Sequence, residues 1–431
     1  MALWRIGQSI LKTKLSKANN FHIRRLIYLT YVLAFKLKHI ILSHMENFRK
    51  SEIPYLLVGI FLSIFILNFL HQELGLRHVL VFSIGLGLGI TLYHASFGFT
   101  GGWREFIEHK KSSSLRAQII MLAFAVVLFS LSIGNKSLIY DGNMVGAIAP
   151  LSISVIVGSF IFGFAMQLGG GCGSGTLFTA ASGNTKMLVT LIFFIIGSLV
   201  GTYHFTFWSS LPSLGTISLI DKFNAYENIG MQLSFLFLLY IGFSFLESKR
   251  NHQINHLDIF KTSNFNIVKG PWPLFLGAVL LAILNFFMLH AAGHPWSVTF
   301  AFGLWGAKIA NIIGINVGEW DFWQLSYPST ALENSVLADP TTVSNLGIIL
   351  GALIAVNLAG KFSNKSNINS KLFLAAVIGG FFMGYGARLA FGCNVGALFS
   401  GIASGSLHGW VWFLFAFIGS IYGVKARKYF Y

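Results

Sequence analysis

Residues 158–178 read GSFIFGFAMQLGGGCGSGTLF, an apolar segment that runs into five glycines around one cysteine. Glycine in a helix interior costs about 1 kcal/mol relative to alanine, so the glycines predict a break in the helix. A break inside a bilayer is tolerated only where protein or water satisfies the freed backbone groups, and we therefore expect a buried loop that lines a cavity. If a new helix begins after Gly173, its unpaired N–H groups form an anion site. The alternative is that the small residues only allow close helix packing.

The same pattern occurs a second time along the chain. Residues 379–399 read GGFFMGYGARLAFGCNVGALF and align with 158–178 at a constant offset of 221 residues. Nine positions are identical, and they include the two cysteines of the chain, Cys172 and Cys393. The match resumes, after one inserted residue, between 181–183 and 403–405 and between 196–198 and 418–420, and a weaker similarity pairs 82–89 with 300–307. The repeat predicts two duplicated halves.

Composition places these halves in a membrane. Of 431 residues, 55% are apolar and 10% charged, against roughly 25% charged residues in a soluble domain. Apolar windows of about the length of a membrane span recur at 55–70, 79–96, 117–134, 149–168, 188–205, 229–246, 273–290, 296–313, 345–360, 372–390 and 408–424. We predict an all-α polytopic membrane protein with nine to eleven helices. An ordinary soluble enzyme is excluded.

The net charge of +16 does not indicate a nucleic-acid partner. Ten of the 30 lysines and arginines lie within residues 1–50, which is typical of a segment at the inner surface of a membrane. We divide the chain into a basic cytoplasmic segment (1–54), a first membrane repeat (55–205), a linking helix with a cytoplasmic connector (206–270) and a second membrane repeat (271–431). The apolar run 26–35 suits a helix on the membrane surface, with a short crossing as the alternative.

Loop charges predict the topology. The loops 103–116, 247–270 and 361–371 and the tail 425–428 are rich in cations and should be cytoplasmic, as should both termini. Residues 314–343 hold four carboxylates and no lysine or arginine, and should be external. If every apolar window were a full crossing, the acidic segment 314–343 would lie on the cytoplasmic side. The basic loops can be cytoplasmic and the acidic segment external only if 296–313 is re-entrant or broken. The two cysteine loops then enter from opposite sides, as in inverted repeats whose broken helices meet at a central cavity.

Polar residues near the breaks are candidate ligands. Arg388 lies in an apolar stretch five residues before Cys393, so it either holds an anion, braces loop carbonyls or extends to the membrane surface. Gln167 occupies the matching position in the first repeat. Asn394 either donates to an oxyanion or, as we favour, caps the next helix.

Two further segments offer candidates. SFGFTGGWRE (96–105) contains Gly98 and Thr100 and either forms a third broken segment along the same path or is a cytoplasmic turn. Lys308 is an intramembrane cation that either attracts anions, pairs with a carboxylate or extends to the surface.

The thiols have three interpretations. A free cysteine is commonly an inert, buried apolar residue. A helix N-terminus could instead lower the thiol pKa and make a nucleophile or sulfur carrier. A weak S–H donor could also pass a sulfur-containing anion from loop to loop without covalent chemistry. The repeat favours the last two interpretations.

At these residues the chain resembles the YeeE/YedE family of bacterial inner-membrane transporters of sulfur compounds, whose characterised members take up thiosulfate. The resemblance spans about residues 55–423 and rests on GGGCGSG, GYGARLAFGCNVGALFSGI, WSVTFAFGLWGAK and SFGFTGGWR. It implies an hourglass-like set of helices with inward-dipping loops, in which Cys172 and Cys393 relay the anion through S–H···S contacts. The family's first glycine-rich segment carries a Cys-Phe-Thr where this chain has Gly98-Phe99-Thr100, so a third relay cysteine is missing.

We therefore predict an inner-membrane transporter, not an enzyme, for a small sulfur-containing anion, thiosulfate or a related sulfur or selenium species. The binding residues are predicted to be Cys172, Cys393, Gly171, Gly173, Gly392, Asn394, Arg388, Gln167, Gly98, Thr100 and Lys308. No cofactor is expected, and the partners are the anion, the lipid bilayer and, as the resemblance implies, a cytoplasmic sulfur carrier of the TusA type. The alternatives are a membrane sulfurtransferase or redox protein with a persulfidated cysteine, or a passive anion channel.

Overall fold

The computed structural model describes residues 53–133, 142–251, 258–362 and 368–431. The apolar run 26–35 lies outside this part of the chain. Ten of the described helices are long and apolar enough to cross a membrane. Apart from them, the described secondary structure consists of short helices and one small antiparallel pair, β1 (Pro150–Ser152) and β2 (Ser213–Thr216). The protein is an all-α polytopic membrane protein.

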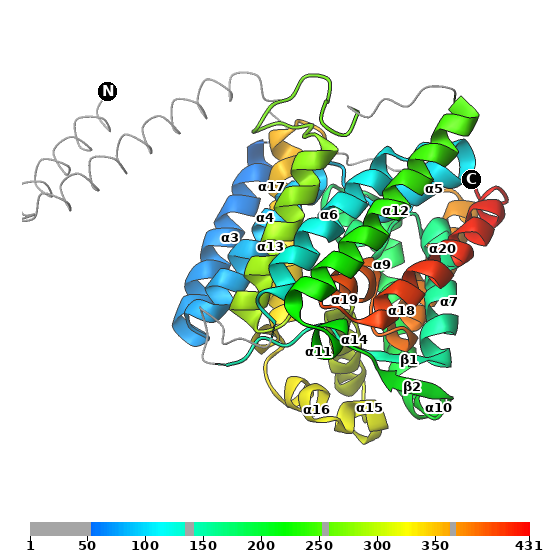
Figure 1. Ribbon diagram of the computed structural model, residues 1–431. Coiled ribbons are helices and arrows are strands. Elements are labelled where there is room, and N and C mark those ends of the chain that lie inside the picture. The colour runs from blue at the N-terminus through cyan, green and yellow to red at the C-terminus, as the bar shows by residue number, and fades with distance from the viewer. Residues whose placement is uncertain (1–52, 134–141, 252–257, 363–367) are drawn as a thin grey trace, which may run out of the picture. The chain divides into compact units, whose positions relative to one another are not determined.

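The helices follow one another in two similar series (Figure 1). The first comprises α3 (Ile53–Glu73), α4 (Leu76–His94), α5 (Phe99–His109), α6 (Ser113–Ser130), α7 (Ile153–Gly169), α8 (Gly173–Ala181) and α9 (Thr185–Tyr203). The second comprises α12 (Ala225–Asn251), α13 (Leu274–Ala292), α14 (Thr299–Ile312), α17 (Pro340–Leu358), α18 (Ser370–Leu389), the π-helix η3 (Asn394–Phe399) continued by α19 (Ser400–Ala403), and α20 (Leu407–Arg427).

Short elements join these helices. They are α10 (Phe205–Ser209), α11 (Leu219–Lys222), η1 (Val317–Glu319), α15 (Asp321–Gln324), α16 (Ser326–Glu333) and η2 (Val336–Ala338). In Figure 1, α10, α15, α16 and the β1–β2 pair lie at one end of the helices, and the end of α5 lies with the C-terminal residues at the other. The acidic segment is therefore separated from the end of α5 and from the C-terminal residues, which belong to segments predicted to be cytoplasmic.

Helices of one series pack mainly on helices of the other. α4 packs on α17 and α6 on α13, while α7 packs on α20 and α9 on α18. Very close approaches occur in equivalent positions of the two series: a β-carbon built on Gly197 of α9 would collide with the carbonyl oxygen of Phe381 in α18, and one on Gly419 of α20 would collide with that of Phe160 in α7. Only glycine permits backbones to approach so closely.

The helical segments of these two series are broken at four places. Non-helical residues separate α4 from α5, α7 from α8, α13 from α14 and α18 from η3. At 1.5 Å per residue, the 14 residues of α14 extend roughly 21 Å, short of the roughly 30 Å of a bilayer core. The weak similarity of 82–89 to 300–307 pairs the full-length helix α4 with α14, a helix that follows a break, so it does not match the order of elements.

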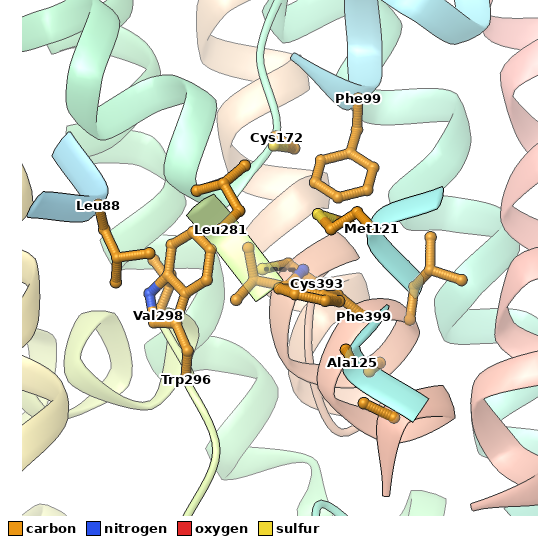
Figure 2. Close-up of a cluster of buried hydrophobic side chains, with 14 of the residues drawn as sticks. Leu88, Phe99, Met121, Ala125, Cys172, Leu281, Trp296, Val298, Cys393 and Phe399 are labelled. Atoms are coloured by element: carbon orange, nitrogen blue, oxygen red, sulfur yellow. Dashed lines mark hydrogen bonds between the residues drawn. The ribbon is translucent and has the colours of Figure 1, made fainter. Parts of the chain in front are cut away.

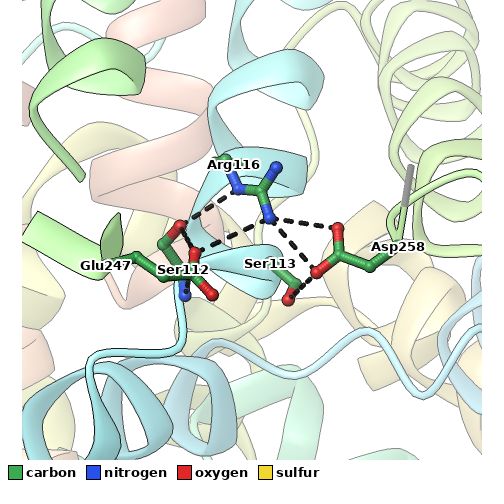
Figure 3. Close-up of polar contacts among 5 residues, drawn as sticks. All are labelled: Ser112, Ser113, Arg116, Glu247 and Asp258. Atoms are coloured by element: carbon green, nitrogen blue, oxygen red, sulfur yellow. Dashed lines mark hydrogen bonds and ion pairs between the residues drawn. The ribbon is translucent and has the colours of Figure 1, made fainter. Parts of the chain in front are cut away.

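An ion-pair cluster fixes α6 to α12 and to the connector that follows it (Figure 3). The buried Arg116 Nη2 lies 3.0 Å from Oδ1 of Asp258 and 3.7 Å from Oε2 of Glu247. Ser112 Oγ donates to the same Glu247 oxygen at 2.5 Å, and Ser113 Oγ donates to Asp258 Oδ2 at 2.6 Å. Three chain segments are thus held together by the ion pairs of the buried Arg116.

Candidate functional site

The first glycine-rich segment breaks the helix next to Cys172. α7 ends at Gly169, and Gly170 turns the chain in the left-handed region with φ 91°, which glycine adopts readily. Cys172 then occupies the N-cap of α8, where its Sγ accepts a hydrogen bond from the backbone N–H of Gly175 at 3.4 Å. The hydroxyl of Ser174 lies 3.6 Å from the same sulfur. The thiol therefore stands at the start of a new helix.

The second segment repeats this arrangement at Cys393. α18 ends at Leu389, and the chain turns through Phe391 (φ 57°) and Gly392 (φ 155°). Cys393 is the N-cap of η3, and its Sγ accepts from the N–H of Val395 at 3.4 Å. The favoured interpretation of Asn394 as the cap is therefore wrong, because the sulfur of Cys393 takes that place.

The two broken segments meet. A β-carbon on Gly173 would lie 3.0 Å from Cys393 Sγ and 3.5 Å from Cγ1 of Val298, the N-cap residue of α14. Figure 2 shows both cysteines within one cluster of buried side chains that includes Phe99, Met121, Leu281, Trp296 and Phe399. Cys172 is 1% exposed and Cys393 0% exposed. The thiols thus lie in a buried, largely apolar interior.

Four helix starts converge on this cluster. α5, α8, α14 and η3 have Gly98, Cys172, Val298 and Cys393 as N-caps, and neither Gly98 nor Val298 provides a side-chain cap. Because the first N–H groups of a helix have no partner within the helix, each start carries a partial positive charge. The interior is therefore favourable for an anion although the cluster contains no basic side chain.

Buried polar atoms without partners lie beside the breaks. Neither the amide oxygen nor the amide nitrogen of Asn394 has a hydrogen-bond partner among the described residues, and the residue is 0% exposed. The same holds for Oγ1 of Thr100, Oε1 of Gln167 and Nε1 of Trp296. A buried polar atom left unpaired costs about 1–3 kcal/mol, so such atoms indicate a ligand or ordered water.

Gln167 connects the first break to α5. Its Nε2 donates to the carbonyl oxygen of Thr100 at 3.3 Å. Gly98, at the start of α5, has φ −115° and ψ 127°, and no atom lies within 4 Å of a β-carbon built on it. Gln167 therefore holds the start of α5, and the space that a side chain at Gly98 would occupy is free.

Arg388 faces a cavity at the end of the helices that carries β1 and β2. The cavity has a volume of about 310 Å³, and its walls include Ser154, Gly201 and Phe391. The guanidinium Nη2 donates to Ser198 Oγ and to the carbonyl oxygen of Thr299, both at 3.2 Å. Its Nε is buried without a partner among the described residues. Arg388 thus stabilises the first turn of α14, and its Nε–H group remains available as a hydrogen-bond donor.

Comparison with known proteins assigns the family. The sequence profile described as "Sulphur transport" matches residues 94–422, well over half of the chain. The chain belongs to the sulphur-transport family, which is the YeeE/YedE family.

Its relatives include transporters from bacteria. The probable transporter YedE of Escherichia coli (strain K12) is 30% identical over 154 residues, which are 36% of this chain and 37% of YedE. The thiosulfate transporter TsuA of Spirochaeta thermophila is 26% identical over 343 residues, or 78% of this chain and 95% of TsuA. TsuA of Escherichia coli (strain K12) is 22% identical over 78% of this chain and 90% of TsuA. The chain thus matches little more than a third of YedE but nearly the whole of TsuA.

Lys308 of this family member does not lie with the other predicted site residues. Its Nζ donates to the carbonyl oxygens of Leu332 and Asn334 (2.6 Å for Asn334), at the end of the acidic segment. These carbonyls hold its ammonium group at the side of α14 away from the N-cap, and binding of the anion by Lys308 stays a prediction. No carboxylate within the described ranges forms an ion pair with it.

The two remaining glycines shape the loops of the sulphur-transport protein. A β-carbon on Gly171 would lie 3.2 Å from the backbone N of Thr176, and one on Gly392 would lie 2.7 Å from that of Ala397. Both glycines thus let the loop fold back onto the helix that follows it. In the part of the chain that the structure describes, no three His, Cys, Asp or Glu residues are grouped so that they could hold a metal ion.

Sequence reasoning missed three groups of this site. Trp296 contributes a buried indole N–H, Ser174 contacts the sulfur of Cys172, and Ser198 holds Arg388. Ser174 lies within the glycine run and Trp296 within the WSVTF motif, so both stretches contained a usable signal. Ser198 is one of many hydroxyls in an apolar helix, and nothing in the sequence distinguishes it.

Proposed function

We propose that the protein is a transporter of the bacterial inner membrane that takes up a small sulfur-containing anion, thiosulfate or a related sulfur or selenium species. The observation that carries the proposal is the contact between the two broken segments, where Gly173 lies against the sulfur of Cys393 and each segment begins with a thiol. Membership of the sulphur-transport family and the thiosulfate transporters among its relatives agree with it.

The anion's charge and its sulfur have separate partners in this proposal. Backbone N–H groups at the helix starts and the amide of Asn394 receive the oxyanion without a fixed countercharge, which lets it leave again. The thiols of Cys393 and then Cys172 contact its sulfur through S–H···S interactions, and no covalent bond forms. Arg388, in the cavity at the outer end, draws the anion toward Cys393.

Orientation follows from the loop charges. We infer that the end with α15 and α16 is external, that the end with the C-terminal residues is cytoplasmic, and that the N-terminus is cytoplasmic too. The two series are then inverted repeats whose breaks meet at mid-membrane depth. The order of elements favours α12 as the first helix of the second repeat, equivalent to α3, rather than as a separate link. A TusA-type sulfur carrier would take the anion on the cytoplasmic side.

The alternatives predict different observations. A sulfurtransferase would carry a persulfide on Cys172 or Cys393 during turnover, whereas the relay leaves both thiols unmodified. A passive channel would conduct without saturation. The burial of both sulfurs among apolar side chains favours a selective path over an open channel.

The experiment is uptake into proteoliposomes containing the full chain, measured for thiosulfate, sulfite, sulfate and selenite. We expect saturable uptake of an anion that carries a polarizable sulfur or selenium atom. This uptake should be lost in Cys172→Ala and in Cys393→Ala, while the amount of protein in the membrane is unchanged. Intact-mass measurement after turnover tests for a persulfide. Full uptake by the double variant would reject the relay.

A further inference from the structure

A group of side chains covers the end of α7 on the face opposite the Arg388 cavity. Arg427 Nη1 donates to the carbonyl oxygen of Gln167 at 2.9 Å. Lys186 Nζ donates to those of Leu168 and Gly169 at 3.1 and 2.8 Å. The phenol of Tyr431 also donates to Leu168, at 3.0 Å. Residues from α9, α20 and the C-terminal tail thus meet at the last turn before the Cys172 loop.

The ring of Tyr431 lies against both cations. Its centroid is 4.4 Å from Lys186 Nζ and 3.3 Å from the guanidinium carbon of Arg427. A β-carbon on Gly170 would lie 3.0 Å from Lys186 Nζ and 3.3 Å from the Tyr431 oxygen. The cluster of Lys186, Arg427 and Tyr431 is therefore packed directly on the loop that presents Cys172.

Among the described residues, no carboxylate lies within ion-pair distance of the cations of this cluster. Arg104 lies near enough for its charge to act on both Lys186 and Arg427. Within the described ranges none of these three cations forms an ion pair, and Glu108 acts on Arg427 only from beyond ion-pair distance. Lys186 is only 8% exposed. A buried cation such as Lys186, next to the half-buried Arg427 and without an ion-pair partner among the described residues, favours an anionic ligand.

The equivalent place at the other end of the molecule is open. Arg388, Leu389 and Phe391, which align with Gln167, Leu168 and Gly170, line the cavity of about 310 Å³. The surrounding backbone is alike, because a β-carbon on Gly201 would meet Cβ of Arg388 at 2.7 Å and one on Gly423 would meet Cβ of Gln167 at 3.0 Å. What differs is that Tyr431, Lys186 and Arg427 fill the inner place.

We propose that Lys186 and Arg427 form a second binding site for a small inorganic oxyanion, beyond Cys172 on the path, and that the side chain of Tyr431 occupies this site until the anion displaces it. The proposal rests on the proposed function, because it assigns the step by which the transported anion leaves Cys172. The displaced ring gives up its contacts with two cations, and the anion replaces them with charge-assisted hydrogen bonds. Tyr431 is half exposed, so it can swing outward.

The competing explanation is purely structural, because cations at a helix C-terminus stabilise its unpaired carbonyls. The two explanations differ in sidedness. A structural brace acts on the whole transporter, so its loss weakens transport from both sides alike. Loss of a binding site at the inner end changes mainly the half-saturating concentration of an anion that arrives from the inner side.

The test is thiosulfate transport in both directions across proteoliposomes in which the orientation of the full chain has been determined. We expect Lys186→Gln to raise the half-saturating thiosulfate concentration at the inner side by about tenfold, the scale of one lost charged hydrogen bond, and to raise that at the outer side much less. Tyr431→Ala should lower the half-saturating thiosulfate concentration at the inner side. Tyr431→Phe should lower it less, because only the hydrogen bond from the phenol to the carbonyl of Leu168 is lost. Lys425→Gln is the matched control, because Lys425 lies on α20, as Arg427 does, but its Nζ contacts the ring of Tyr422 instead of Tyr431.

The outcomes separate this inference from the function on which it rests. The inference would be overturned if Lys186→Gln changed the half-saturating thiosulfate concentration equally at both sides. It would also be overturned if Lys186→Gln and Tyr431→Ala had the same half-saturating concentration at the inner side as Lys425→Gln. Either result would leave uptake established. Absence of wild-type uptake for every anion would reject the proposed function. In that case equilibrium binding of thiosulfate to the purified protein decides the site, and equal binding by wild type and Lys186→Gln would overturn it.

Discussion

A side chain at Gly173 would begin 3.0 Å from the sulfur of Cys393, closer than the 3.4–4 Å of an ordinary van der Waals contact. The first residue of α8 and the N-cap of η3 therefore touch only because residue 173 has no β-carbon. The distance between the two thiols, and with it the proposed relay, depends on one missing methyl group.

Gly173→Ala should consequently impair transport. The added methyl group pushes Cys393 or α8 away by a few tenths of an ångström, and such overpacking costs about 1–3 kcal/mol. We expect sulfur-anion uptake to fall by about tenfold with the membrane content little changed. Gly230→Ala in α12 is the control, since nothing lies within 4 Å of its added carbon. Uptake by Gly173→Ala equal to that of the control would contradict the proposed contact.

Gly98→Cys should broaden or shift substrate preference. The backbone at Gly98 is extended, with φ −115°, and open space surrounds a β-carbon there, so a cysteine fits without strain. Its thiol would stand beside Thr100 at the start of α5 and give the relay a third sulfur. We expect thiosulfate uptake to rise relative to sulfite and sulfate. Gly98→Ser adds a side chain of similar size without sulfur, and identical preferences in the two variants would count against sulfur recognition at this position.

Arg388→Gln should weaken capture of the anion from the outer side. The charge lost at the cavity reduces attraction for an anion, and we expect the half-saturating concentration to rise by about tenfold, with a weaker dependence on salt. Arg388→Lys keeps the charge but not the planar group that reaches both Ser198 and Thr299, so an intermediate value is expected. Measurement of uptake over a range of salt concentrations tests this. A salt dependence identical to wild type in Arg388→Gln would remove Arg388 from the path.

Arg116→Met should destabilise the protein without touching the thiols. It leaves Glu247, whose side chain is only 8% exposed, without its cation, and an uncompensated buried charge costs about 3–5 kcal/mol. Thermal unfolding in detergent should occur at a clearly lower temperature. Lys249→Met, at an exposed position of the same helix α12, should unfold like wild type. The double variant Arg116→Met, Glu247→Gln should recover part of the loss, and failure to do so would show that the cluster is not the cause.

The sequence predicted those features that depend on backbone chemistry. Consecutive glycines around Cys172 and their counterpart at Cys393 predicted broken segments, and the structure has a break at each. The acidic segment predicted that 296–313 is re-entrant or broken, and the structure has non-helical residues between α13 and the short helix α14. Both inferences use properties of the chain itself, the conformational cost of glycine and the placement of charge.

Features that depend on which distant side chains meet were not predictable in this way. Asn394 resembles a cap by residue type, but the preceding cysteine reaches the free N–H first. Lys308 was chosen as an intramembrane cation, and nothing in the sequence indicates its hydrogen bonds to the carbonyls of Leu332 and Asn334. The contact of Lys186 with Tyr431 joins residues 245 positions apart, and no pattern in either segment indicates it.

The exchange of partners between the two helix series has a consequence for biogenesis. During translation, α4, α7 and α9 enter the bilayer before α17, α20 and α18 have been synthesised, so glycine-lined faces such as that of Gly197 meet lipid first. The nascent first series must wait for the second before its closest contacts can form. A chain that stalls midway therefore leaves an incomplete bundle, a ready substrate for membrane proteases, and assembly of the anion path is delayed until the last helix has been made.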